Sequence, residues 1–254
     1  MAKKDEQVTW YWQEIPGVTA GISRRIAGWM NVDVVDLERG KIGQVNRDKF
    51  FSSLGFNPGR VAVITGRKHS TNIRAVDLDS AGKVVYNEDG VDALSTNEGG
   101  LILAGTMADC LPLYFYEPKA RVVGVAHAGW RGVLNNMAGK MVAHLRNTYP
   151  GIDLVSLQVL IGPCIRSCHF EVQSDLEAVF KDEYIDQIKY QDGKVFIDLP
   201  GVIKKQLAEA GVASGNINDS GECTHDLADK YFSFRRDKPD RVQSMVAFIR
   251  LNDE

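Results

Sequence analysis

Two apolar segments separated by a short polar connection dominate the hydrophobic pattern, and both lie within residues 101–132. The first segment leads into Cys110, and the second, residues 122–126, runs directly into His127. Residues 117–119, Glu-Pro-Lys, form a connection short enough to join two adjacent buried strands. Because a strand end holds a side chain more rigidly than a loop tip, we expect Cys110 and His127 to belong to one site.

Another compact apolar segment, residues 61–65, predicts a further buried strand, and His69 follows it closely. An isolated loop histidine usually only forms hydrogen bonds, but the same placement at Cys110 and His127 favours a common site for all three side chains. Three protein ligands and an open position are typical of catalytic zinc, whereas structural zinc takes four ligands. A thiolate with two imidazoles suits zinc and also copper.

Apolar residues recur at helical spacing over residues 133–145 and predict one amphipathic helix that packs on the sheet. The amino end of this helix lies directly after His127. Its free N–H groups, with Arg131 beside them, would therefore suit an anion such as phosphate. The alternative is that Arg131 is a solvated loop charge.

Three further helices have recognisable ends. A helix over residues 46–55 would begin at Asn46 as N-cap and stop at a glycine. The capping-box pattern at residues 174–177, Ser-Asp-Leu-Glu, opens a second helix, and a third starts after Asp198 and ends at Gly211.

Strands are interspersed with these helices without a regular βαβ rhythm, and the chain shows no internal repeat or linker. The sequence therefore predicts one α+β domain over residues 1–254, built from layered mixed β-sheets flanked by helices.

Composition narrows the class of protein. The 254 residues are 44% hydrophobic and carry a net charge of −3, which argues against a nucleic-acid-binding surface. The longest nearly apolar run is interrupted by Asp109 and is shorter than a membrane span, and the charged amino end lacks a signal-peptide pattern. Four cysteines without an export signal indicate reduced thiols in the cytoplasm.

A second cluster of chemically active residues lies at Cys164, Cys168 and His169. These residues would suit a metal knuckle, but no second ligand pair has the usual finger spacing. The pattern therefore favours buried structural thiols. In the tail, the aromatic run over residues 231–234 is more typical of core, and Arg235-Arg236 would serve as a phosphate clamp or as surface charge.

Three kinds of chemistry fit the first site. A zinc ion held by His69, Cys110 and His127 would lower the pKa of a bound water, and Asp109 would orient a ligand, shuttle a proton or bond nearby backbone. Alternatively, Cys110 and a histidine form a metal-free nucleophilic pair. A non-catalytic metal-binding module is the third interpretation.

Several motifs of the chain resemble the signatures of the laccase-domain family, known both as polyphenol oxidases and as purine nucleoside phosphorylases. The resemblance covers nearly the whole chain, in the same order. Its motifs are Ala108-Asp109-Cys110-Leu111-Pro112, His127-Ala128-Gly129-Trp130-Arg131-Gly132, Ile161-Gly162-Pro163-Cys164-Ile165, Cys223-Thr224 and Phe232-Ser233-Phe234-Arg235-Arg236.

The resemblance implies a single α+β domain and a zinc-type centre formed by His69, Cys110 and His127. It also implies phosphorolysis of adenosine, inosine and methylthioadenosine to base and ribose 1-phosphate, together with deamination of adenosine. Copper-dependent oxidation of phenols and peptidoglycan editing are further activities associated with the family. We therefore predict a cytoplasmic, zinc-dependent enzyme whose partners are purine nucleosides and phosphate, without a membrane or nucleic-acid partner.

The sequence departs from the family pattern next to the first metal histidine. Arg67 and Lys68 stand where the family usually has Gln and Val, and residues 42–47 replace the usual Gly-Asp before the Val-x-x-Asn-Arg segment. Two cations beside a metal favour anionic ligands. The predicted substrate-binding residues are accordingly Arg67, Arg131, Arg235 and Arg236. The sequence indicates neither the preferred nucleoside nor the oligomeric state.

Overall fold

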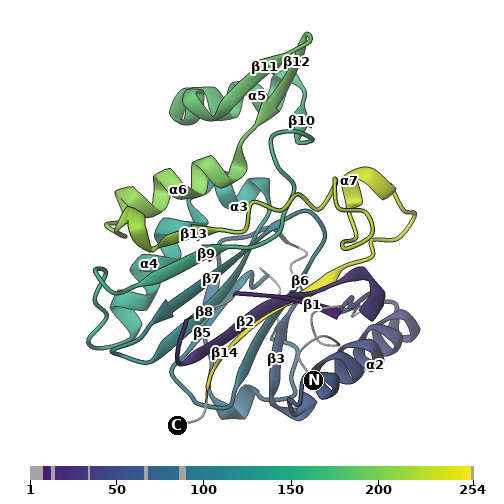
Figure 1. Cartoon of the computed structure of the whole chain (residues 1–254), viewed down its shortest axis with the longest axis vertical. Coiled ribbons are helices and arrows are strands. Elements are labelled where there is room, and N and C mark those ends of the chain that lie inside the picture. Colours follow the sequence, from purple (N-terminus) through teal and green to yellow (C-terminus); the bar gives the residue numbers. More distant parts are fainter. Residues whose placement is uncertain (1–7, 13–14, 34, 66–67, 86–89, 253–254) are drawn as a thin grey trace.

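Two large β-sheets pack face to face at the centre of the molecule (Figure 1). The structure is a computed structural model and describes residues 8–12, 15–33, 35–65, 68–85 and 90–252. The five-stranded sheet has the order β1-β2-β14-β6-β3, and the six-stranded sheet has the order β13-β9-β7-β8-β5-β4.

The strands of the five-stranded sheet are β1 (Thr9–Tyr11), β2 (Val18–Ser23), β14 (Met245–Leu251), β6 (Ile102–Met107) and β3 (Val61–Ile64). Those of the six-stranded sheet are β13 (Ile217–Asp219), β9 (Gln158–Ile161), β7 (Leu111–Glu117), β8 (Val122–Ala128), β5 (Ala93–Thr96) and β4 (Ile73–Ala75). Both sheets contain parallel and antiparallel pairs, so the predicted α+β fold with layered mixed sheets is confirmed.

Helices cover the outer face of each sheet. Within the described ranges, the α-helices with complete bounds are α2 (Leu37–Ser53), α3 (Trp130–Leu134), α4 (Met137–Thr148), α5 (Ser174–Tyr184), α6 (Leu199–Glu209) and α7 (Phe234–Asp237). Short 3₁₀ turns lie at η1 (Arg25–Ala27), η2 (Pro58–Arg60), η3 (Leu78–Ser80), η4 (Ile185–Gln187) and η5 (Ser214–Asn216). A small third sheet of β10 (Glu171–Val172), β12 (Lys194–Ile197) and β11 (Ile188–Gln191) projects with α5 from one end (Figure 1).

The core has three hydrophobic layers. One layer lies between the two sheets, a second lies between the six-stranded sheet and its helices, and a third lies between the five-stranded sheet and α2. Successive residues of a strand point to opposite faces. Both faces are covered, so β7, β8 and β14 are apolar almost throughout rather than alternating.

The predicted strand pair is the β7–β8 hairpin. Its antiparallel register runs from Glu117↔Val122 at the connection to Leu111↔Ala128 at the open end. Cys110 directly precedes β7 and His127 is the penultimate residue of β8, so the hairpin brings both residues to the same edge of the sheet.

The helix predicted over residues 46–55 is longer at its amino end. It is α2, and its N-cap is Asp36, whose side chain accepts from Arg39 N, so the prediction of Asn46 as N-cap is wrong. Gly40 and Gly43 made the first half look unfavourable for a helix, but they allow close packing. A Cβ there would lie 2.3 Å from Asp33 O and 2.0 Å from Asn31 O, respectively.

The helix predicted over residues 133–145 is divided. Asn136 adopts a left-handed conformation (φ 59°, ψ 46°) between α3 and α4 and caps α4 by accepting from Gly139 N. Asparagine tolerates this conformation better than most residues, and hydrophobic spacing alone does not reveal the break. The helix that begins directly after the His127 strand is therefore the five-residue α3 rather than the long helix predicted, and the anion site at its amino end remains a prediction.

The other two predicted helices are present, with one correction. α6 begins after Asp198, whose side chain accepts from Gly201 N, and Gly211 follows its end with a φ of 92°, as predicted. The capping box at residues 174–177 is wrong: Gln173 is the N-cap of α5 and forms no side-chain cap. Among the described residues, every helix is too short or too polar to cross a lipid bilayer.

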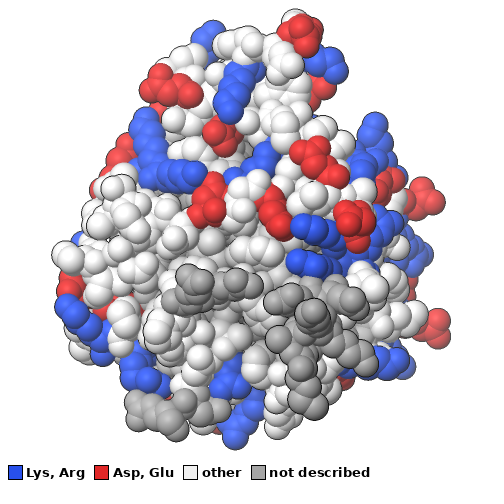
Figure 2. Space-filling model, viewed as in Figure 1, with Lys and Arg blue, Asp and Glu red and all other residues white. Residues whose placement is uncertain are grey.

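Charged side chains of both signs are interspersed on the face shown in Figure 2. Lysines, arginines and carboxylates lie side by side around the projecting small sheet and α7 in this view. This mixture matches the small net charge of −3.

We expect Phe248→Ala to lower the free energy of unfolding by about 3–5 kcal/mol, because the truncation leaves a cavity in the layer under α2. Phe248 is fully buried, and its ring packs edge-on against Phe50, Phe51 and Phe56 at centroid distances of 5.5–5.9 Å. Urea denaturation measures the loss. The control is Phe234→Ala, the same truncation at a ring that is 51% exposed, and an equal effect of the two substitutions would contradict this account.

Candidate metal centre

The side chains of His69, Cys110 and His127 meet at one edge of the two-sheet core. One ligand atom of each lies within 4.8 Å of the others, and Cys110 Sγ is 3.9 Å from His69 Nε2. The two imidazole rings stack with centroids 5.1 Å apart and an interplanar angle of 19°. His127 is buried, whereas the other two are partly exposed, so the group is open on one side.

His127 is oriented by a carboxylate that the sequence analysis did not select. Asp92 Oδ1 lies 3.0 Å from His127 Nδ1, and both side chains are almost completely buried. The other carboxylate oxygen accepts from Ser70 N and Ser70 Oγ, each at 2.6 Å. A bond at Nδ1 leaves Nε2 of His127 for the cluster, which is the common carboxylate–histidine–metal arrangement.

A signal for Asp92 was present in the sequence. It directly precedes the buried strand β5, which pairs with β8 in the register Ala93↔Ala126, so Asp92 lies opposite His127. The backbone confirms this pairing, because His127 N donates to Asp92 O at 2.7 Å. A carboxylate at the start of an otherwise apolar strand requires a partner, and an adjacent strand that ends in histidine supplies one.

The electrostatics of the cluster favour a thiolate. Burial alone would raise the pKa of Cys110, but His127 and His69 outweigh it and lower that pKa to about 6. Burial would also lower the pKa of His127, whereas the Cys110 thiolate and the Asp92 carboxylate raise it. The thiolate and the imidazolium therefore stabilise each other, and a metal ion that bound both side chains would take the place of the imidazolium proton.

Asp109 has a positional role in the structure. Residues 108–110 carry the chain from β6 in one sheet to β7 in the other, and Asp109 turns it with a φ of 75°. Its carboxylate accepts from Thr224 Oγ1 at 2.6 Å, Ser233 Oγ at 3.0 Å and Arg235 N at 2.7 Å. With three donors satisfied, Asp109 holds the crossing that presents Cys110, which argues against the proton-shuttle interpretation.

Gly129 leaves room for the cluster. A Cβ at this position would lie 2.9 Å from the Cδ2 atom of His69 and 3.2 Å from Cys110 Sγ. Any larger residue after β8 would therefore displace the histidine ring or the sulfur atom.

The cluster opens into a pocket of about 620 Å³. His69, Cys110 and His127 form part of its wall, together with polar, charged and apolar residues from α2, the β6–β7 crossing and the segment before β14. The other described residues of the wall are Asn31, Val32, Asp33, Val35, Asp36, Arg39, Thr65, Thr106, Met107, Ala108, Phe234, Arg241, Val242 and Ser244.

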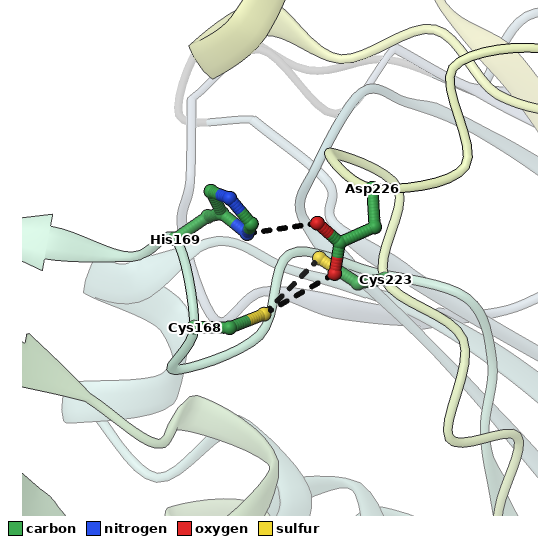
Figure 3. A group of neighbouring side chains, drawn as sticks. All are labelled: Cys168, His169, Cys223 and Asp226. Carbon is green, nitrogen blue, oxygen red and sulfur yellow. Dashed lines mark hydrogen bonds and ion pairs between the residues drawn. The ribbon is translucent and has the colours of Figure 1, made fainter.

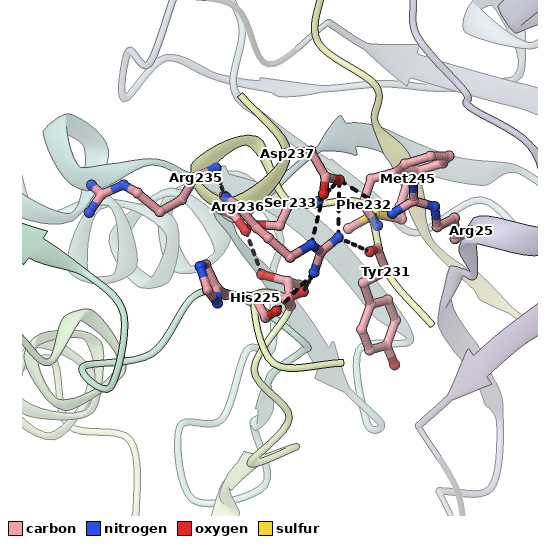
Figure 4. A network of polar contacts seen from close by, with 11 residues as sticks. Arg25, His225, Tyr231, Phe232, Ser233, Arg235, Arg236, Asp237 and Met245 are labelled. Atoms are coloured by element: carbon pink, nitrogen blue, oxygen red, sulfur yellow. Dashed lines mark hydrogen bonds and ion pairs between the residues drawn. The ribbon is translucent and has the colours of Figure 1, made fainter. Parts of the chain in front are cut away.

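The predicted substrate arginines do not line this pocket among the described residues. Arg131 is exposed and lies over the Trp130 ring, 4.1 Å from its centroid. Arg236 donates to the carbonyl oxygens of Thr224, His225 and Tyr231 and pairs with Asp237, whereas Arg235 extends the other way and donates to Glu171 O (Figure 4). Their assignment as phosphate ligands remains a prediction.

Arg67 falls outside the described residues, so its predicted role remains a prediction as well. Two other arginines, Arg39 and Arg241, line the pocket instead. Arg39 lies over the Trp29 ring at 4.5 Å, and Arg241 pairs with Asp36, the N-cap of α2. Neither arginine was predictable from the sequence, because only the fold brings α2 and the chain before β14 to the metal cluster.

A second group of metal-ligand side chains lies apart from the first. It contains Cys168, His169, Cys223 and Asp226, whose ligand atoms are within 4.8 Å of one another. Cys164 is buried as predicted, but Cys168 is exposed, so the prediction of buried structural thiols is wrong for that residue. The missing ligand pair comes from far along the chain, where finger spacing does not apply.

The comparisons with known proteins agree with this architecture. A family model described as "Multi-copper polyphenol oxidoreductase laccase" matches residues 18–252. The chain belongs to this family. It also resembles a solved structure, the Bacillus licheniformis hypothetical protein YfiH, with a TM-score of 0.86, 27% identity and coverage of 97% of each chain.

Two curated relatives carry names with an activity. The purine nucleoside phosphorylase YlmD of Geobacillus stearothermophilus is 36% identical over 178 residues, which are 65% of this chain and 61% of the relative. The adenosine deaminase RL5 of an unknown prokaryotic organism is 33% identical over 182 residues, which are 70% of this chain and 66% of the relative. The aligned regions therefore span somewhat less than two thirds of either relative's length.

We expect Asp92→Asn to weaken zinc binding at the first cluster about 10- to 100-fold, because the amide no longer fixes His127 as a carboxylate does. Competition with a chelating dye measures the affinity, and a thermal melt verifies that the variant is folded. Asp79→Asn is the matched control, since Asp79 is an exposed carboxylate of η3. Equal zinc affinity in folded Asp92→Asn and wild type would show that Asp92 does not support the ligand.

Proposed function

We propose that this protein is a zinc-dependent purine nucleoside phosphorylase that also deaminates adenosine. The observation that carries the proposal is the meeting of His69, Cys110 and His127 at the wall of a pocket that also contains an aromatic ring and two arginines. The activities in the names of the two bacterial relatives support it. Four free thiols agree with the reducing cytoplasm that we expect for the enzyme.

The cluster fits a zinc ion. Two imidazole nitrogens and a thiolate are ordinary zinc donors, three protein ligands leave a position for substrate or water, and Asp92 completes the support of His127. When bound there, zinc would supply Lewis acidity and lower the pKa of a water molecule. The residues of the pocket wall would bind the substrate, orient it and enclose it.

The pocket has the size and lining that a nucleoside requires. A volume of about 620 Å³ is typical of small-molecule sites. Phe234 exposes half of its surface on the wall and offers a face on which a purine stacks. Arg39 and Arg241 supply fixed positive charge for phosphate, and a guanidinium keeps free donors after it pairs with one carboxylate.

In phosphorolysis, a phosphate oxygen forms a bond to C1′ of the ribose as the C1′–N9 bond breaks. The base leaves with the bonding electron pair and takes up a proton. Arg39 and Arg241 would hold the phosphate for this attack, and Phe234 would hold the base. In deamination, water adds to C6 of the same stacked purine and ammonia leaves.

A copper-dependent phenol oxidase is the second candidate, favoured by the family description and by a donor set that also accepts copper. It predicts oxygen consumption with a phenol only in copper-loaded protein. Among the described residues, one three-ligand cluster lies at the pocket. A single metal ion there is poorly suited to the four-electron reduction of oxygen. A metal-free reaction of the Cys110–His127 pair, including peptidoglycan editing, is the remaining alternative.

Zinc-loaded protein incubated with adenosine should release adenine and ribose 1-phosphate only when phosphate is present, and inosine also without phosphate. Product analysis by chromatography measures both. Cys110→Ala should abolish turnover and remove one zinc per chain. If turnover disappears while the zinc count stays, the thiol is a nucleophile rather than a ligand. If adenosine remains intact under both conditions, the nucleoside proposal fails for this substrate.

Substitution of the base-stacking ring and substitution of a phosphate-binding arginine should change different kinetic constants. Phe234→Ala should raise the KM for adenosine roughly 5- to 150-fold, because base stacking contributes about 1–3 kcal/mol. Arg241→Ala should raise the KM for phosphate roughly 10- to 150-fold, because it removes a charged hydrogen bond of about 1.5–3 kcal/mol. Arg131→Ala is the discriminating variant. If it raises the KM for phosphate and Arg241→Ala does not, the sequence-based assignment replaces the pocket-based one.

A further inference from the structure

Four side chains from two distant segments point toward one another (Figure 3). Two of them are exposed, and none of them lines the pocket. Cys168 and His169 lie in the loop between β9 and β10, and Cys223 and Asp226 lie between β13 and α7. The segments are joined by backbone bonds, because Cys164 N donates to Glu222 O and Thr224 N donates to Cys164 O.

The donor atoms of the group lie at separations close to those in a tetrahedral zinc site, with one carboxylate oxygen of Asp226 facing the sulfur of Cys168 and the other facing the ring of His169. Zn–S bonds of about 2.3 Å and Zn–N or Zn–O bonds of about 2.0 Å imply edges of roughly 3.8 Å (S–S), 3.5 Å (S–O) and 3.3 Å (N–O). The observed Cys168 Sγ–Cys223 Sγ distance is 3.7 Å, Cys168 Sγ–Asp226 Oδ2 is 3.5 Å, and His169 Nδ1–Asp226 Oδ1 is 3.2 Å.

One nitrogen of the group has no hydrogen-bond partner among the described residues. His169 Nδ1 is buried, and although Asp226 Oδ1 lies 3.2 Å away, the pair does not have the alignment of a hydrogen bond. The His169 ring is held in this position by stacking on His225, with centroids 3.8 Å apart and an angle of 15°. Figure 3 marks the contact with Asp226 as an ion pair, which requires a protonated ring. In a neutral ring this buried nitrogen, beside two thiols and a carboxylate, would be satisfied by a metal ion.

We propose that Cys168, His169, Cys223 and Asp226 form a second, structural zinc site. Two sulfurs, one imidazole and one carboxylate make a complete set of four ligands, which is characteristic of a closed structural site rather than a catalytic one. The mixture of soft sulfur and hard carboxylate oxygen suits zinc better than copper(I), which prefers sulfur ligands alone, or magnesium, which prefers oxygen.

The site would cross-link the two segments that contain its ligands. One segment contacts Asp109 directly through Thr224, and the other contacts it through Arg235. Thr224, adjacent to Cys223, donates to Asp109 Oδ1, and Arg235 N donates to Asp109 Oδ2. The Arg235 guanidinium in turn donates to the carbonyl oxygens of His169 and Glu171. Zinc at the second site would thus stabilise the crossing that presents Cys110, without touching substrate.

Zinc should be counted by mass spectrometry after gel filtration in the presence of a reductant. We expect two zinc ions per chain in wild type, one in Cys110→Ala, and none retained in Cys110→Ala/Cys168→Ser. Cys168 is exposed, so its replacement by serine should leave the fold intact. Asp226→Asn should weaken retention at the second site, whereas the matched control Asp229→Asn, an exposed carboxylate outside the cluster, should not.

Cobalt provides an independent readout. In the Cys110→Ala background, Co²⁺ should give thiolate-to-cobalt charge transfer and tetrahedral visible bands, and both should disappear on Cys168→Ser. Since these measurements use no substrate and lack the first site's thiolate, they are independent of the proposed function. The proposal is overturned if Cys110→Ala retains no zinc, if Cys168→Ser leaves the zinc count unchanged, or if Cys168 and Cys223 form a disulfide that persists under reductant and excludes metal.

Discussion

The carboxylate of Asp109 is the constraint on which the candidate centre depends. At this residue the chain leaves one sheet and enters the other in a left-handed conformation, and three hydrogen bonds from distant segments hold the carboxylate. Each donor comes from the region between residues 224 and 235, so the last part of the chain determines where Cys110 lies. The turn is unfavourable for most residues, but aspartate tolerates it better and its bonds compensate for the strain.

The two packed sheets also contribute to the centre, because they form a buried apolar layer with the reactive side chains at its edge. His127 shares the inner face of β8 with Val123 and Val125, so its ring enters the layer between the sheets. Burial would normally suppress charge on both a thiol and an imidazole. Here each charge stabilises the other, and Asp92 adds a third, so that the pair is ionised despite low exposure. The same strands therefore build the core and prepare a ligand set.

The parts of the fold and of the centre that depend on residues adjacent in the chain could be predicted from the sequence. The β7–β8 hairpin, the α+β class and the start of α6 at Asp198 follow from adjacent residues. The first half of α2 was missed because Gly40 and Gly43 oppose a helix locally, although they allow its contact with Asp33 and Asn31. The pairing of Asp92 with His127, and of Cys168 with Cys223, joins residues 35 and 55 positions apart. Such contacts depend on tertiary structure, which spacing rules do not contain.

The position of β14 has a consequence for how the molecule is made. This strand comes last in the sequence of strands, yet it lies in the middle of the five-stranded sheet, between β2 and β6. During synthesis from the amino end, β2 and β6 leave the ribosome long before their common neighbour exists, so the edges that will face it carry unpaired backbone N–H and C=O groups. The five-stranded sheet therefore cannot be completed until residues 245–251 have been synthesised. The insertion of β14 between β2 and β6 is a late, non-local pairing, and such pairings slow folding. Until it occurs, the unpaired strands favour aggregation or binding by chaperones.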